Sequence, residues 1–105
     1  MALSIQADAA MFIVSLSYIA PLSDIDALLE QHVAWLRQGY ASGLLLASGR
    51  KTPRTGGVIL ARGDRAELEA LLARDPFAVA GLARYEITEF HASMSAPELD
   101  CLRNI

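Results

Sequence analysis

At 105 residues the chain has room for a single domain with a modest core, and 53% of its residues are hydrophobic, a high share for that size. A formal net charge of −3 and the lack of a lysine-rich run argue against a nucleic-acid partner. One cysteine, Cys101, excludes an intrachain disulfide, and no carboxylates lie at a metal-ligand spacing from the two histidines.

The first clear pattern along the chain is an alternation of apolar residues that begins after residue 10. We expect residues 1–10 to be a loose N-terminal leader and residues 12–19 to form a strand. One face of this strand carries Phe12, Val14, Leu16 and Tyr18. The apolar stretch 11–22 is too short to span a bilayer, and no basic residue precedes it as in a signal peptide. We therefore expect a cytoplasmic protein with no membrane partner.

Residues 23–42 are predicted to form one long amphipathic helix, with Ser23 as its N-cap and Gly43 as its C-terminal stop. His32 lies inside the apolar sector of this helix, on the line of Ile25, Leu29 and Leu36. A titratable ring aimed at the core needs a polar partner there. His32 is therefore either a core histidine bonded to a carbonyl or a functional group.

Two strands are predicted next, at residues 44–50 and 58–62, with a loop over residues 51–55 between them. In the first of these strands, alternation places one set of residues on a common face: Leu44, Leu46, Ser48 and Arg50. Asp64 is expected to cap a second helix, whose apolar stripe is Leu68, Leu71 and Leu72. The pair Asp75-Pro76 is typical of a helix start and predicts a short helix over residues 76–80.

The last predicted strand covers residues 83–91, with Tyr85 and Ile87 on one face. Residues 92–105 form a C-terminal tail that either contains a short helix or depends on a partner. Ser95 and Glu98 have the spacing of a capping box, and the narrow apolar edge of that helix ends at Ile105. The main domain is thus expected over residues 11–91.

The element order β-α-β-β-α-β predicts an α+β, ferredoxin-like fold with a four-stranded antiparallel sheet and both helices on one face. The predicted strands are apolar on both faces, whereas two helices cover only one. An exposed apolar face of that size is unusual in a monomer. We therefore expect a homodimer in which two sheets pack face to face as a dimeric barrel.

Several short motifs occur in the order of these elements. They are a histidine midway along the first helix, Ala47-Ser48-Gly49-Arg50, Pro53-Arg54-Thr55-Gly56-Gly57, Asp75-Pro76-Phe77, Ala80-Gly81-Leu82 and Glu89-Phe90. Together, across residues 11–90, they resemble the YciI-like (YCII-related) proteins of the dimeric α+β barrel superfamily. The chain departs from the familiar Ser-Gly-Pro form of the second motif, because Arg50 stands in place of the proline.

This resemblance implies a dimeric ferredoxin-like fold and an active site built on a His–Asp pair, which corresponds here to His32 and Asp75. A carboxylate that orients an imidazole is a common arrangement for general acid–base catalysis. Asp75 is also placed to cap the helix that begins at Pro76, and the two roles are compatible because a carboxylate has two oxygens.

Three further residues are candidates for substrate binding: Ser48, Arg50 and Arg54. The two arginines, with Lys51, place cations near one end of the sheet, where they could hold a carboxylate or phenolate oxygen. The alternatives are an ordinary strand serine and a solvated loop. No Gly-x-Ser-x-Gly motif supports a serine nucleophile. His91 is given no role, and Trp35 and Tyr40 are expected to be packing residues.

The first functional hypothesis is a lyase or isomerase that uses His32 and Asp75 for proton transfer on a small enolisable or hydroxylated ring compound. This chemistry, an isomerisation or an elimination, requires no cofactor and no metal. The alternative from another class is a non-catalytic sensor or accessory module that binds a small anionic or aromatic ligand. A pure oligomerisation domain is a third option.

Overall fold

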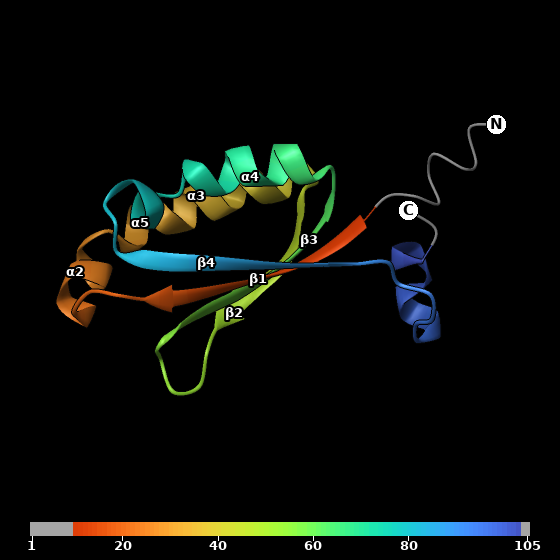
Figure 1. Ribbon diagram of the computed structural model, residues 1–105, viewed down its shortest axis with the longest axis horizontal. Coiled ribbons are helices and arrows are strands. Elements are labelled where there is room, and N and C mark those ends of the chain that lie inside the picture. The colour runs from red at the N-terminus through yellow and green to blue at the C-terminus, as the bar shows by residue number, and fades with distance from the viewer. Residues whose placement is uncertain (1–9, 104–105) are drawn as a thin grey trace.

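Four antiparallel strands, with helices on one face of their sheet, form the ferredoxin-like α+β fold that the sequence predicts (Figure 1). The computed structural model describes residues 10–103. The strands are β1 (Ala10–Tyr18), β2 (Leu45–Arg50), β3 (Gly56–Gly63) and β4 (Ala83–Phe90). The helices are α2 (Leu22–Ala27), α3 (Leu29–Ala41), α4 (Arg65–Ala73) and α5 (Pro76–Val79), followed by a 3₁₀-helix, Pro97–Leu102.

The strand β1 lies inside the sheet, between β3 and β4, and its alternating residues divide the apolar face from the outer face. Phe12, Val14 and Leu16 are at most 2% exposed, whereas the intervening Ile13 is 41% exposed. This confirms the predicted alternation. The strand begins at Ala10, which the sequence placed in the leader, and the remainder of that leader, residues 1–9, lies outside the described residues.

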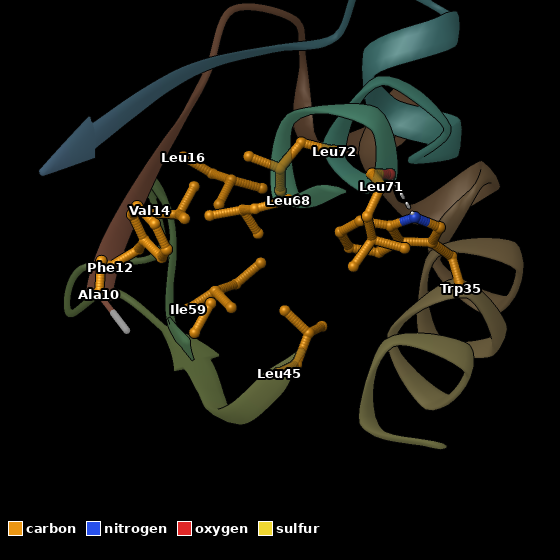
Figure 2. Close-up of a cluster of buried hydrophobic side chains, with 11 residues drawn as sticks. Ala10, Phe12, Val14, Leu16, Trp35, Leu45, Ile59, Leu68, Leu71 and Leu72 are labelled. Carbon is orange, nitrogen blue, oxygen red and sulfur yellow. Dashed lines mark hydrogen bonds between the residues drawn. The ribbon is translucent and has the colours of Figure 1, made fainter. Parts of the chain in front are cut away.

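The core lies between the inner face of the sheet and the helices α3 and α4 (Figure 2). The predicted stripe of α4 is buried in it, and Asp64 caps that helix by accepting a hydrogen bond from the backbone N–H of Glu67 at 3.0 Å. Trp35 on α3 is 4% exposed and donates its indole N–H to the carbonyl oxygen of Leu71 at 2.9 Å. The indole therefore joins α3 to α4 and satisfies its own polar atom inside the core.

The prediction of one unbroken helix over residues 23–42 was wrong. Leu28 adopts φ −109° and ψ 7°, which lies outside helical geometry and separates α2 from α3. Ser23 is not the N-cap, because the helix begins one residue earlier. The carbonyl of Pro21 accepts the first hydrogen bonds, from the backbone N–H groups of Asp24 and Ile25. Gly43, at φ 85°, ends α3 as expected.

The strict alternation predicted for residues 44–50 was also wrong. Leu45 pairs with Ala61, but Ala47 pairs with Leu60, so Leu46 is an extra residue in a β-bulge. The bulge changes the face of the residues that precede it. Leu45 therefore points into the core, on the same side of the sheet as Ser48.

The tail forms a 3₁₀-helix in place of the capped helix predicted from Ser95 and Glu98. Its N-cap is Ala96, and Pro97, which has no N–H to satisfy, takes the first position. Ser95 donates its hydroxyl to Asp100 at 3.3 Å instead. Ile105 lies outside the described residues. Among residues 10–103, no helix is both long and apolar enough to cross a membrane.

The outer face of the sheet carries exposed apolar side chains, which keeps the homodimer as our prediction. Ile13 and Val58 are each 41% exposed and Phe90 is 37% exposed. Sedimentation velocity at micromolar concentration should give about twice the 11.3 kDa chain mass. Ile13→Lys should give a monomer, because a charge in the middle of a paired sheet face would be desolvated.

The matched control is Val79→Lys, on α5 in the helix layer, where the side chain is 75% exposed and belongs to no sheet face. This variant should remain a dimer. A monodisperse monomer of the unmodified protein would contradict the prediction.

Candidate active site

A histidine on α3 and the aspartate that precedes α5 are hydrogen-bonded to each other. His32 Nδ1 lies 2.8 Å from Asp75 Oδ1, although 43 positions separate the two residues in the chain. The Asp75 side chain is 0% exposed and the His32 side chain is 13% exposed. The carboxylate therefore lies inside the protein and the imidazole lies between it and solvent.

Asp75 accepts three hydrogen bonds, which is how a buried carboxylate can be tolerated. Oδ1 accepts from His32 Nδ1 and from the backbone N–H of Phe77 at 3.1 Å. Oδ2 accepts from the hydroxyl of Tyr85 at 2.5 Å. The bond to Phe77 is the predicted helix cap, so Asp75 both caps α5 and orients the imidazole.

The hydrogen bond from Nδ1 to the carboxylate determines which imidazole nitrogen remains available. A carboxylate only accepts, so the neutral ring carries its proton on Nδ1 and its lone pair on Nε2. The ring plane is held by two aromatic neighbours. Phe77 stacks on it at a centroid distance of 4.2 Å and an angle of 12°, and Trp35 lies at 5.4 Å and 30°.

Tyr85 is a site residue that the sequence reasoning missed. It lies on β4 opposite Leu16 of β1, on the face of the sheet that meets the helices. Burial, and then the hydrogen bond to Asp75, raise the pKa of the Tyr85 phenol above its ordinary value. The predicted alternation placed Tyr85 on the same face of the strand as the apolar Ile87. A phenol on an apolar face needs a hydrogen-bond partner when it is buried, so the sequence held a signal for this residue.

A cavity of about 340 Å³ opens beside His32, between α3 and the inner face of the sheet. Its polar lining comes from β1, α2, α3, β2 and the loop before β3, and consists of Tyr18, Asp26, His32, Ser48, Arg50 and Arg54. Its apolar wall on α3 consists of Leu29, Val33 and Leu36. Close approach of β1 and β3 at one end of this region depends on Gly56, where a Cβ atom would lie 1.8 Å from the carbonyl oxygen of Leu16.

All three predicted substrate-binding residues, Ser48, Arg50 and Arg54, line this cavity, but the three predicted cations do not form one cluster. Arg54 is held by Asp26, with Nη2 of the guanidinium 2.6 Å from Oδ1 of the carboxylate. Lys51 lies outside the lining and points its ammonium group at the Ser17 hydroxyl, 3.4 Å away. Arg50 lines the cavity and has no ion pair among the interactions of the described residues. The sequence reasoning did not identify Asp26.

Ser48 faces the cavity but does not contact the His–Asp pair. Its hydroxyl lies 2.5 Å from the hydroxyl of Tyr40, which joins β2 to α3. Tyr40 is 39% exposed, so it is less a packing residue than the sequence suggested. His91 is exposed and lies beyond the end of β4. In the part of the chain that the structure describes, no group of three or more His, Cys, Asp or Glu side chains could hold a metal ion.

The element order and the sheet define an α+β protein of the ferredoxin-like class. Within this class, the model of the YCII-related domain family matches residues 11–91, and the chain therefore belongs to that family. A comparison with proteins of curated function gave no match.

Solved structures confirm the fold. The 5-chloro-2-hydroxyhydroquinone dehydrochlorinase TftG from Burkholderia phenoliruptrix AC1100, in complex with 2,5-dihydroxybenzoquinone, matches at a TM-score of 0.67 and 18% identity, covering 78% of this chain and 95% of that one. SnoaB, a cofactor-independent oxygenase from Streptomyces nogalater, matches at 0.53 and 18% identity, covering 87% and 99%. A mutant of SnoaB matches at 0.50 and 16% identity, with the same coverage.

The two aspartate helix caps permit a matched test of what the buried site contributes to stability. Asp75→Ala removes a cap and leaves two part-buried donors, on His32 and Tyr85, without their acceptor, and should lower the free energy of unfolding by about 3 kcal/mol. Asp64→Ala removes an exposed cap alone and should cost about 1 kcal/mol. Urea denaturation measures both values. Equal losses would mean that the contacts of Asp75 with His32 and Tyr85 add nothing to its cap.

Proposed function

We propose that this protein is an acid–base enzyme in which His32 and Asp75 transfer a proton on a small enolisable or hydroxylated ring compound, in an isomerisation or an elimination. One observation carries the proposal. The Nδ1 atom of His32 is bonded to a fully buried carboxylate while the same side chain lines a cavity. With Nδ1 bonded to the carboxylate, Nε2 is the imidazole nitrogen left to act as a base toward a ligand in the cavity.

In the first step, His32 Nε2 takes the proton of a ring hydroxyl, and the O–H bonding electrons form a C=O bond. In an isomerisation, the displaced double-bond pair takes the proton back from the imidazolium at a ring carbon. In an elimination, the pair takes that proton at the ring carbon that bears the leaving group X, and this carbon becomes sp³. His32 then removes the proton of a second ring hydroxyl, the O–H electrons form a second C=O bond, the adjacent double-bond pair shifts toward the sp³ carbon, and X departs with its bonding electrons, so that the net loss is HX. Asp75 stabilises the imidazolium between the two steps without accepting its proton.

The size and the walls of the cavity favour a single ring. A dry protein cavity of about 150 Å³ accommodates benzene, and the cavity here, of about 340 Å³, leaves room for ring substituents as well. The apolar side chains of α3 can cover the ring faces. The polar side chains of the lining are fewer than its other residues, as in small-molecule sites that fix orientation with a small number of hydrogen bonds.

Arg50 supports the proposal electrostatically. Removal of a hydroxyl proton places negative charge on an oxygen, and a guanidinium beside it stabilises that charge. Arg54 is already partly neutralised by Asp26, so Arg50 is the cation that the described residues leave for the ligand. A hydroxylated quinone, of the kind bound to the structurally similar dehydrochlorinase, has the size and the acidic hydroxyl that this site requires. The steps draw on neither a metal nor a cofactor, because the base and the cation supply the chemistry.

The proposal is tested by proton exchange at carbon, which reveals tautomerisation without knowledge of the natural substrate. The probes are 1,2,4-trihydroxybenzene and 2,5-dihydroxybenzoquinone in D₂O, and ¹H NMR follows the loss of their ring C–H signals. The protein should accelerate exchange of at least one probe. His32→Gln should lower that rate by at least about a hundredfold, the usual contribution of a general base.

The control is His91→Gln, at an exposed histidine outside the cavity, which should leave the exchange rate unchanged. A chlorinated trihydroxybenzene extends the assay to elimination, with released chloride as the readout. If the probes bind but neither exchange nor chloride release is accelerated, the site is a small-ligand sensor without turnover, and the enzymatic proposal is wrong.

A second prediction concerns ligand charge. Arg50→Gln should weaken binding of a hydroxybenzoate by about 1 to 2 kcal/mol, less than a sheltered charge-assisted hydrogen bond because the Arg50 side chain is exposed. Lys51→Gln removes an equal charge one residue away, outside the cavity lining, and should change affinity far less. Isothermal titration measures both. Equal effects would show that only the net charge of the loop matters.

A further inference from the structure

The oxygen Oδ2 of Asp75 has one hydrogen-bond partner among the described residues, the hydroxyl of Tyr85. The other oxygen is shared by His32 Nδ1 and the backbone N–H of Phe77. Asp75 is 0% exposed, so bulk water cannot take the place of a missing donor. Among the described residues, the Tyr85 hydroxyl is therefore the donor that satisfies Oδ2.

This phenol comes from a different element from the other two donors. The backbone N–H of Phe77, in α5, donates to Oδ1, and the hydroxyl of Tyr85, on β4, donates to Oδ2. Hydrogen bonds from a helix and from a strand therefore fix the plane of the carboxylate. Without the hydrogen bond from Tyr85 the carboxylate can turn about its last side-chain bond. This turn moves Oδ1, the acceptor that the Nδ1–H group of His32 requires.

Tyr85 does not itself line the cavity. Its influence on a ligand must therefore pass through Asp75. Burial and the hydrogen bond to Asp75 also keep it protonated, since both raise the pKa of the Tyr85 phenol. It thus remains a hydrogen-bond donor to Asp75 throughout the proposed proton transfer.

We propose that Tyr85 is a positioning residue for the proton-transfer site. By donating to Oδ2 it keeps Oδ1 directed at Nδ1 of His32, and so keeps the basic lone pair of the imidazole on Nε2, at the cavity. The proposal rests on the proposed function, and it extends the His–Asp pair to a Tyr85–Asp75–His32 chain that reaches from the sheet to the ligand.

The first test needs no ligand and no activity. Long-range ¹H–¹⁵N NMR of the histidine-labelled protein at a pH where the ring is neutral distinguishes the two tautomers of His32. The unmodified protein should show the Nδ1–H form, and Tyr85→Phe should show a measurable share of the Nε2–H form. Phenylalanine keeps the ring and its packing, so the variant removes the hydroxyl alone.

The control for a general loss of stability is Ile87→Val, two residues along β4 on the same inner face, where the side chain packs against the core and has no polar atom to bond to Asp75. This variant should keep the tautomer of the unmodified protein. Thermal unfolding establishes that both variants are folded at the temperature of the NMR experiment.

A direct measurement on the unmodified protein covers the case in which Tyr85→Phe does not fold. The Tyr85 hydroxyl proton should exchange with water far more slowly than that of Tyr40, whose hydroxyl is also hydrogen-bonded but whose side chain is 39% exposed. Equally fast exchange would overturn the proposal, because the donor would then not be held against Asp75.

The second test uses the ring-exchange assay. Tyr85→Phe should lower the saturating rate by about ten- to hundredfold, the factor expected for loss of one hydrogen bond to a charged group, and leave KM within about twofold. Ile87→Val should leave both unchanged. If Tyr85→Phe changes neither the tautomer of His32 nor the saturating rate, Tyr85 is a packing residue and the proposal is wrong.

If no probe exchanges in the unmodified protein, the proposed function fails. The tautomer of His32 in Tyr85→Phe then still decides the role of Tyr85.

Discussion

The burial of the Asp75 carboxylate is the constraint on which the site depends. A charged group without contact with water must have its oxygens paired, and here the partners come from three separate parts of the chain: α3, the first turn of α5, and β4. The geometry of the site therefore depends on how these three elements pack together. Any arrangement that separated α3 from α5 would leave a buried charge without its donor, and that cost stabilises the observed arrangement against alternatives.

The imidazole of His32 is also held by contacts from several parts of the chain. Its Nδ1 is bonded to the carboxylate, one aromatic ring stacks on it closely and a second lies near. Trp35 is in turn anchored to α4 through its indole N–H. The side chain that meets the cavity is thus attached to the core through aromatic contacts and to the sheet through Asp75. An imidazole held in this way has little conformational freedom left to lose, which is the physical content of preorganisation.

Among residues 10–103, one arginine at the cavity, Arg54, has an ion-pair partner and the other, Arg50, has none. Asp26 lies at the end of α2, and the helix break at Leu28 separates its segment from α3, which carries His32. The ion pair between Asp26 and Arg54 joins α2 to the loop before β3. The two corrections to the expected secondary structure, the helix break and the β-bulge at Leu46, both lie in segments that contribute residues to the cavity lining. The helix break and the β-bulge thus both lie next to residues that line the cavity.

The sequence by itself determined the element order, the inward face of β1, the caps at Asp64 and Asp75, and the pairing of His32 with Asp75 through its family motifs. These rest on short-range rules of alternation and capping, or on a pattern of residues that a family shares. Three contacts were decided only by the tertiary structure. Tyr85 donates a hydrogen bond to Asp75, Asp26 forms an ion pair with Arg54, and the ammonium group of Lys51 lies near the Ser17 hydroxyl and not in the cavity lining. The physical reason is that each of these contacts joins elements distant along the chain, and periodicity states which face a side chain occupies but not which partner it meets across the core.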